Sequence, residues 1–302
     1  MGRNGRPRQP FSIQPCNKKI DPKPSLLLLL SLTIREAPLN PSAFSQLHAG
    51  FAVETTGDGS PTLRQVINDG GPDLPPESMH HSGGALSETL YVYGPVLKWG
   101  FQQSPSAKFF SLGLGLGYHE MFWALLDFSL EKKSQLLTSE ASEPLSLEFL
   151  NWATGEKEIE LYDEIARQIL ASRWPDFLPA PLTFNSSVSV QDLRSHLGLS
   201  HQQKRWSLLS ALSISSLRNW KLERNFNCDG ILYDAFSRKT SPELWSEEFL
   251  TEFLQTTAAP RCAFGTYACL APLKKALGVE QFQLEVREGF LGKRNASLAF
   301  RL

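Results

Sequence analysis

The stretch Phe109-Phe110-Ser111-Leu112-Gly113-Leu114-Gly115-Leu116-Gly117 decides the fold of this chain. Its first four residues predict a short buried strand, and Tyr118–Leu126 behind it predicts an apolar helix. The three glycines lack a Cβ atom, so the backbone can turn sharply there and approach a bound molecule. The helix would then point its first N–H groups at that molecule. We expect a nucleotide-like cofactor at this strand–turn–helix unit, and a glycine-rich turn without a ligand is the alternative.

The spacing Gly-x-Gly-x-Gly is more often seen with S-adenosylmethionine than with dinucleotides, which favour Gly-x-Gly-x-x-Gly. A carboxylate that binds the ribose is expected about 20 residues further on, at the end of the next strand. Gln135–Ser139 predicts that strand, and Glu140 follows it, 140 − 117 = 23 positions after the last glycine. Glu131, at 131 − 117 = 14 positions, leaves too little room for a helix and a strand. Glu143 is a further alternative, because strand ends are predicted only to within a few residues.

The rest of the chain alternates between strands and helices. The expected strands are Gly230–Tyr233, Arg261–Tyr267, Phe282–Arg287 and Ser297–Arg301. The expected helices are Glu158–Ser172, Pro242–Thr256 and Leu270–Leu277, with a helical turn at Asp192–Gly198 after a loop at Phe177–Val190. This order predicts an α/β fold of the Rossmann type, with a doubly wound, mainly parallel sheet and an antiparallel pair at its end.

A small β-hairpin is expected before this sheet. Residues 51–56 and 62–67 are rich in β-formers, and the turn Gly57-Asp58-Gly59-Ser60 between them contains the Asp-Gly pair that hairpins favour. We therefore divide the chain into an N-terminal extension, a hairpin and substrate-side segment, and a cofactor-binding domain, at residues 1–50, 51–100 and 101–302.

Composition excludes some classes of protein. Residues 1–50 carry seven Lys and Arg against two Asp and Glu and have no periodicity, which is typical of a disordered or extraneous extension. The Leu26–Leu32 run is too short to span a bilayer. The four cysteines form no CxxC pair, so no zinc site is expected, and buried thiols in a reducing cytoplasm fit them better.

Asp234, Ala235 and Phe236 follow the expected strand Gly230–Tyr233 directly. Ligands of open α/β sheets bind at the carboxyl ends of the strands. Asp234 could orient an amine and accept its proton, and Phe236 could stack on a base. A turn or helix-capping acid is the alternative for Asp234.

The run from Asp234-Ala235-Phe236 to Pro242-Glu243-Leu244-Trp245 resembles the Asp-Ala-Phe…Pro-Glu-Leu-Trp signature of the MnmC-like methyltransferases. Further stretches agree in order with the stand-alone branch of that family: Asp58–Leu63, His81–Thr89, Leu112–Gly117, Ser139-Glu140 and Gly289–Arg294. The resemblance spans roughly residues 51–302. The chain departs from the family at Arg238, Thr240 and Ser241, where Pro, Lys and Asn are usual.

The resemblance implies a class I methyltransferase that uses S-adenosyl-L-methionine. Its substrate would be the aminomethyl group on the wobble uridine of tRNA, in the anticodon region, without the flavin-dependent oxidoreductase domain of two-domain relatives. The implied cofactor ligands are Gly113, Gly115, Gly117, Tyr118, Glu140 and Glu88. The implied catalytic residues are Asp234 and Phe236, and the implied substrate contacts are His81, Ser82, Lys293 and Arg294.

No metal, membrane or obligate protein partner is implied, and the expected location is the cytoplasm. Two alternatives stay open: a methyltransferase for another RNA or a small amine, and a member that binds cofactor or RNA without turnover. The second alternative rests on the family's Gly-Asp step, which Trp206–Leu217 does not contain in recognisable form.

Overall fold

A computed structural model of the protein describes residues 51–65, 77–139, 143–172, 188–292 and 295–302. The expectation of disorder for residues 1–50 falls outside these ranges. None of the helices in the described part of the chain combines the length and hydropathy that a bilayer-crossing segment needs.

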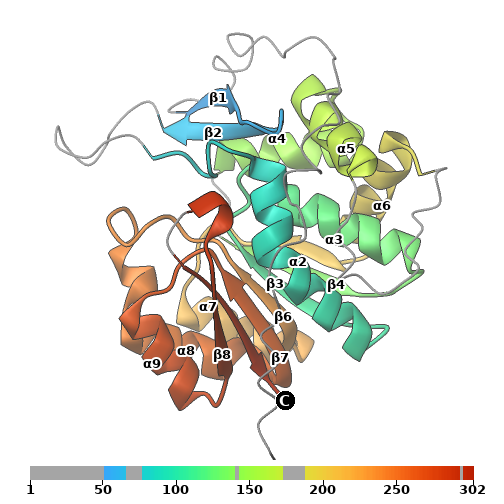
Figure 1. The fold of residues 1–302 in the computed structure, drawn as a ribbon. Coiled ribbons are helices and arrows are strands. Elements are labelled where there is room, and N and C mark those ends of the chain that lie inside the picture. The colour runs from blue at the N-terminus through green and yellow to red at the C-terminus, as the bar shows by residue number, and fades with distance from the viewer. Residues whose placement is uncertain (1–50, 66–76, 140–142, 173–187, 293–294) are drawn as a thin grey trace, which may run out of the picture. The chain divides into compact units, whose positions relative to one another are not determined.

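A seven-stranded sheet organises the domain, with the strand order β5-β4-β3-β6-β7-β9-β8 (Figure 1). Its strands are β3 (Lys108–Leu112), β4 (Gln135–Ser139), β5 (Trp206–Leu208), β6 (Cys228–Tyr233), β7 (Ala258–Thr266), β8 (Gln283–Arg287) and β9 (Ala296–Arg301). Strand β9 runs in the direction opposite to all the other strands of the sheet. The predicted α/β fold with a mainly parallel sheet and a closing antiparallel pair is confirmed.

The inner strands are buried along most of their length, and their centres are apolar. Phe109, Phe110 and Leu112 of β3 are completely buried, as are Ile231 and Leu232 of β6. Parallel strands that are covered on both faces have this composition, because neither face meets water.

Helices cover both faces of the sheet (Figure 1). One apolar core joins the sheet to α2 (Ala85–Gln103), α3 (Tyr118–Ser129), α4 (Glu143–Ala153), α5 (Glu160–Ala171) and α6 (Val190–Gln202). A second core lies on the opposite face and joins it to α7 (Ile214–Arg224), η2 (Pro242–Trp245), α8 (Glu247–Thr257) and α9 (Ala271–Val279). A short 3-10 turn, η3 (Phe290–Gly292), lies between β8 and β9. The chain is therefore doubly wound, as predicted.

The predicted hairpin is confirmed, as β1 (Phe51–Thr55) paired with β2 (Pro61–Gln65). Its turn caps helix α2, which has no side-chain cap of its own at Gly84. Asp58 accepts hydrogen bonds from the Ser87 N–H (3.0 Å) and the Ser87 hydroxyl (2.7 Å). Thr56 and Ser60 accept the Ala85 N–H at 3.1 and 3.0 Å. These bonds satisfy donors that every helix leaves open at its amino end, so the hairpin and α2 form one unit.

Several elements differ from the prediction. The sequence did not predict α2, α4, α7 or β5. The expected turn at Asp192–Gly198 is part of the longer α6. The expected loop Phe177–Val190 ends where α6 begins, and its residues before 188 lie outside the described part of the chain. The expected helix Pro242–Thr256 is broken at Ser246, whose extended backbone and side chain cap α8 separately from η2. Helix α2 also crosses position 100, where the sequence suggested a boundary.

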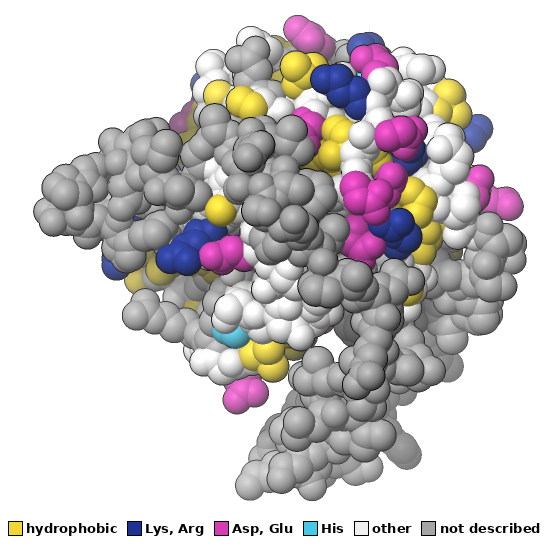
Figure 2. Space-filling view, turned by 90° about the horizontal axis from the view of Figure 1, so that it is seen from above, with side chains coloured by type: hydrophobic (Ala, Val, Ile, Leu, Met, Phe, Trp, Pro, Cys, Tyr) yellow, Lys and Arg dark blue, Asp and Glu magenta, His cyan; other side chains and the backbone are white. Residues whose placement is uncertain are grey.

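Exposed side chains of both charge signs lie next to one another on the hairpin and α5. Arg64 of β2 pairs with Glu54 of β1 at 3.0 Å, and Arg167 of α5 pairs with Glu160 and Glu164. On the face shown in Figure 2, Lys and Arg side chains lie next to Asp and Glu side chains in the same way. Pairs of opposite sign at this exposure contribute little to stability.

Candidate active site

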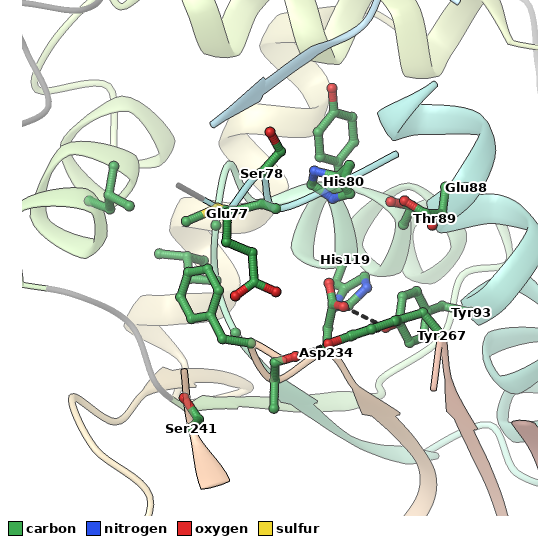
Figure 3. Close-up of a pocket in the computed structure, with 18 of the residues that line it drawn as sticks. Glu77, Ser78, His80, Glu88, Thr89, Tyr93, His119, Asp234, Ser241 and Tyr267 are labelled. Carbon is green, nitrogen blue, oxygen red and sulfur yellow. Dashed lines mark hydrogen bonds between the residues drawn. The ribbon is translucent and has the colours of Figure 1, made fainter. Parts of the chain in front are cut away.

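A cavity of about 190 Å³ opens at the carboxyl ends of β3 and β6 (Figure 3). Its wall is formed by residues of the hairpin, the segment before α2, α2 itself, the glycine turn, α3, α4 and the loop after β6. This is the edge of an open α/β sheet where ligands bind.

The glycine turn after β3 has the backbone that the sequence predicted. Gly113, Gly115 and Gly117 have φ angles of 87°, 50° and 75°, which side chains other than glycine rarely adopt. A Cβ atom on Gly113 would lie 2.8 Å from the Asp234 carbonyl oxygen, so this glycine lets β3 and β6 end side by side.

Gly115 and Gly117 have different surroundings. A Cβ atom on Gly117 would lie 2.3 Å from Cε2 of the buried Phe149 ring. Among the described residues, a Cβ atom on Gly115 would meet only the Met79 sulfur, at 3.4 Å, and Gly115 lines the cavity. Gly117 therefore serves packing and caps α3, whereas Gly115 leaves space that a ligand can occupy. This open cradle at the amino end of α3 fits a nucleotide-like cofactor.

The first turn of α3 is buried beneath the glycines. The Tyr118 hydroxyl donates to the Pro61 carbonyl oxygen at 2.7 Å, which ties α3 to the hairpin, and Tyr118 lines the cavity. His119 Nδ1 lies 2.9 Å from the Ser111 hydroxyl, and burial lowers the pKa of His119 to about 3, so its ring is neutral at pH 7. Burial raises the pKa of Glu120 to about 7, although Thr138 donates a hydrogen bond of 2.6 Å to its Oε1 atom.

Asp234 stands in the wall of the cavity, one residue beyond β6. Its N–H donates to the Leu112 carbonyl oxygen at 3.2 Å, which aligns the ends of β3 and β6. Its Oδ1 atom accepts a hydrogen bond of 2.7 Å from the hydroxyl of Tyr93 on α2. Phe236 lines the same cavity. The structure thus brings the two predicted catalytic residues to the predicted glycine turn.

Two aromatic donors hold the backbone that follows Asp234. The Tyr267 hydroxyl donates to the Ala235 carbonyl oxygen at 2.8 Å, and the Trp245 indole donates to the Phe236 carbonyl oxygen at 2.7 Å. Trp245 is the last residue of the Asp-Ala-Phe…Pro-Glu-Leu-Trp run. The spacing of that run therefore has a structural reason in this chain, because the Trp245 indole reaches back to the Phe236 carbonyl oxygen.

Glu77 belongs to the site, although no motif in the sequence marks it. Its carboxylate accepts hydrogen bonds from the Ser237 N–H and hydroxyl, both at 3.2 Å, and from the Thr240 hydroxyl at 2.6 Å. Glu77 lines the cavity and ties the loop after Phe236 to the segment before α2. A single acidic residue outside any motif gives no sequence signal for such a contact.

Glu88, predicted as a cofactor ligand, is buried in the first turn of α2 and lines the cavity. It accepts the N–H of His81 at 2.6 Å. Figure 3 shows Glu77, Glu88 and Asp234 around one space. None of the described residues that line this space is a lysine or an arginine.

The predicted substrate residues His81 and Ser82 do not line the cavity, whereas the neighbouring His80 does. The His81 ring accepts the Gly83 N–H at 2.9 Å and meets the edge of Phe290, with 5.8 Å between ring centroids. Ser82 is exposed. The structure thus brings the His-Ser-Gly-Gly stretch to the Gly-Phe-Leu-Gly stretch near the C-terminus.

Three predicted site residues, Glu140, Lys293 and Arg294, lie outside the described residues. The chain at position 140 follows Ser139, whose carbonyl oxygen accepts the Gly113 N–H at 2.9 Å. Glu131, the alternative to Glu140 as the ribose-binding carboxylate, is exposed in the turn that leads from α3 to β4, at the opposite edge of the sheet. Glu143 is the first residue of α4.

No metal centre accompanies this site in the residues that the structure describes, because no three His, Cys, Asp or Glu side chains come together there in a way that could hold an ion.

Comparisons with known proteins agree with this geometry. Residues 183–301 match a family model described as S-adenosyl-L-methionine-dependent methyltransferase. A search of curated proteins found no match. Among solved structures, MnmC2 from Aquifex aeolicus shares 20% identity at a TM-score of 0.52, covering 85% of this chain and 74% of that one. At that identity the likeness supports the fold.

Two O-methyltransferases are more distant. One, from Bacillus cereus in complex with SAH, has 14% identity and a TM-score of 0.37 and covers 69% of this chain and 80% of that one. The other, TomG from Streptomyces achromogenes, involved in tomaymycin synthesis and in complex with SAM, has 12% identity and a TM-score of 0.37, covering 69% and 78%. These two likenesses are too low to carry a structural argument. The family match, with the fold and the glycine turn, makes the chain an S-adenosyl-L-methionine-dependent methyltransferase with an MnmC-like fold.

Proposed function

We propose that this methyltransferase acts on a primary amine, namely the aminomethyl group on the wobble uridine of tRNA, in the cytoplasm. The observation that carries the proposal is the acidic cavity at the glycine turn. Glu77, Glu88 and Asp234 line it, and no lysine or arginine is among its described lining residues. An ammonium group and a sulfonium group both carry positive charge, so such a cavity attracts both of them.

The residue pattern fits S-adenosyl-L-methionine. Gly113 and Gly115, together with the amino end of α3, would hold it, and the resemblance assigns its ribose to Glu140. When bound, this cofactor would supply an electrophilic methyl group on its sulfonium for transfer to the amine nitrogen, with the sulfur as leaving group. What the protein contributes is mainly position, because an in-line displacement depends on alignment of the reacting atoms.

Asp234 would orient the amine and take up its proton. It stands beside the glycine turn, and its backbone is fixed by hydrogen bonds on both sides. Phe236 would enclose the base that carries the amine. By resemblance, His81, Ser82, Lys293 and Arg294 would contact the rest of the RNA, and the stretches that hold these residues meet at Phe290.

The test is methylation of tRNA that lacks only the terminal methyl group. The purified protein, methyl-labelled cofactor and this tRNA are incubated, and the nucleosides are separated and identified by mass spectrometry. We expect the label in 5-methylaminomethyl-(2-thio)uridine. Label in another nucleoside, or transfer only to small amines, would refute the wobble uridine as the methyl acceptor and identify the actual one.

Substitution of Asp234 tests its role separately. Asp234→Asn keeps the shape but removes the proton acceptor, so single-turnover rates should fall by roughly 10²- to 10⁴-fold, with cofactor affinity little changed. The matched control is Glu131→Gln, the same kind of change at the opposite edge of the sheet. Cofactor binding without transfer to any acceptor by the wild type would instead indicate a binding protein.

A further inference from the structure

Tyr93 makes a contact with the proposed catalytic carboxylate that no sequence motif foretells. It lies in α2, 141 positions before Asp234, and is only 3% exposed. Its hydroxyl donates to Asp234 Oδ1 at 2.7 Å and lies 3.4 Å from the Tyr233 carbonyl oxygen. Figure 3 shows this bond at the floor of the cavity. The contact therefore joins α2 to the end of β6 at the site itself.

The position of the Tyr93 ring is fixed from several sides. Its centroid lies 4.3 Å from that of His119, in an edge-to-face contact. Helix α2 packs closely on β7, where a Cβ atom on Gly265 would lie 3.2 Å from the Val92 carbonyl oxygen and 3.8 Å from the Tyr93 ring. Of the two acceptors within reach of this hydroxyl, Asp234 Oδ1 at 2.7 Å is much nearer than the Tyr233 carbonyl oxygen at 3.4 Å.

We propose that Tyr93 is a positioning residue for methyl transfer, whose hydroxyl holds the Asp234 carboxylate in the orientation that receives the substrate amine. The proposal rests on the proposed function, because it assigns Asp234 to the amine. A carboxylate one residue beyond a strand can rotate about its side-chain bonds. A charge-assisted hydrogen bond from a rigid donor restricts that rotation and fixes the acceptor for the amine.

The electrostatics of the pair agree with this assignment. Burial and the neighbouring Asp234 raise the pKa of Tyr93 well above its usual value, so the tyrosine stays protonated and can only donate to the carboxylate. A hydrogen bond to the charged form of an acid lowers the pKa of that acid. The other titratable groups that line the cavity with Asp234 or lie beside it are Glu77, His80, Glu88, Tyr118, His119, Glu120 and Tyr267. Of these, His119 is neutral and the carboxylates disfavour a further negative charge at Asp234, whereas the hydrogen bond from Tyr93 favours the ionised form.

The test replaces Tyr93 with phenylalanine, which removes the hydroxyl and keeps the ring. We expect the single-turnover rate to fall about 10- to 100-fold, with cofactor affinity within about twofold of the wild type. The acidic limb of the rate–pH profile should move to higher pH, because Asp234 loses a donor that stabilises its charge. A tyrosine that only filled space would not move this limb.

Tyr91→Phe is the matched control. Tyr91 lies on the same helix, and its hydroxyl donates to the Glu288 carbonyl oxygen away from the cavity, at 2.8 Å. We expect its rate and pH profile to match the wild type. In the Asp234→Asn background, Tyr93→Phe should cause little further loss, because a residue that acts through Asp234 has nothing left to position.

Carbon NMR titration of labelled aspartate carboxyl groups gives a readout that needs no substrate. Asp234→Asn assigns the signal, and Tyr93→Phe should shift its titration midpoint upward. A wild type that does not methylate tRNA would refute the proposed function, yet this titration would still decide whether Tyr93 controls Asp234. The proposal is overturned if Tyr93→Phe keeps the wild-type rate and pH profile while Asp234→Asn is inactive, or if the midpoint does not move.

Discussion

Alanine at Gly115 and alanine at Gly117 should separate cofactor binding from folding. The two glycines lie two positions apart in one turn, and both have positive φ angles, 50° and 75°. Their surroundings differ, however. A methyl group on Gly115 would enter the cavity next to Met79, whereas one on Gly117 would enter the apolar core at Phe149.

The stability cost follows from these contacts. An L-residue in the left-handed region costs about 1–2 kcal/mol relative to glycine, and this applies to both variants. At Gly117 the new Cβ atom would also lie 2.3 Å from the Phe149 ring, which is fully buried against Trp152 and Trp206 and has no room to move. Overpacking of this kind costs about 1–3 kcal/mol more. We therefore expect Gly117→Ala to lower the free energy of unfolding by about 2–5 kcal/mol, and Gly115→Ala by about 1–2 kcal/mol.

Cofactor affinity should follow the opposite order. Gly115→Ala fills space that the cofactor needs, so its Kd for S-adenosyl-L-methionine should rise at least tenfold, or about 1.4 kcal/mol. Gly117→Ala, measured where it is still folded, should bind more nearly as the wild type does. Urea unfolding followed by circular dichroism gives the stabilities, and isothermal titration calorimetry gives the affinities. A folded Gly115→Ala protein with unchanged affinity would refute the assignment of this turn to the cofactor.

Three further perturbations test other contacts. Asp58→Ala should lower the free energy of unfolding at pH 7 by about 1–3 kcal/mol, and equal stability of the two proteins at pH 7 would contradict the capping role. Burial opposes ionisation of Asp58, but hydrogen bonds from Ser60 and Ser87 outweigh it and lower the pKa of Asp58. The wild type should therefore lose this contribution to stability as the pH falls below about 3.8. Glu120→Gln should remove a pH dependence of stability. Because burial raises the pKa of Glu120 from 4.5 to about 7, the free energy of unfolding of the wild type should decline between these pH values, by on the order of 3 kcal/mol at most. In thermal unfolding at pH 8, the glutamine variant should be the more stable protein. Glu77→Ala should reduce kcat about tenfold with unchanged cofactor affinity, since it frees the loop that carries Phe236; no change in kcat would show that the loop holds its position without Glu77.

The elements that the sequence predicted have patterns that are complete within a few residues. Strands β3, β4 and β6 each have a short apolar centre that is buried, and the glycines that follow β3 can be recognised because the backbone there needs positive φ angles. Position relative to a strand end was then enough to place Asp234 at the glycine turn, because parallel strands present their carboxyl ends at one edge.

The elements that the sequence missed depend on distant contacts or have misleading composition. Helix α2 contains the β-formers Tyr91-Val92-Tyr93, and Pro95 stands within it. Its amino end is capped by Asp58 from the hairpin, so no capping residue adjoins it in the sequence. Strand β5 has only three residues, too few for any periodicity. The Tyr93–Asp234 contact could not be predicted, because it requires α2 to be known first.

The departures of this chain from the MnmC-like signature lie in one part of the loop after β6. The signature residues at its two ends are joined by the hydrogen bond from Trp245 to the Phe236 carbonyl oxygen, so they set the course of the backbone past the cavity. The unusual residues lie between these ends: the Thr240 hydroxyl is bound to Glu77, and Ser241 lines the cavity. Substitution there leaves the anchors of Asp234 in place and changes the groups that meet a ligand at the cavity wall. Under the proposed function, the sequence differences would therefore bear on which amine is accepted, whereas the retained part of the signature keeps Asp234 beside the glycine turn.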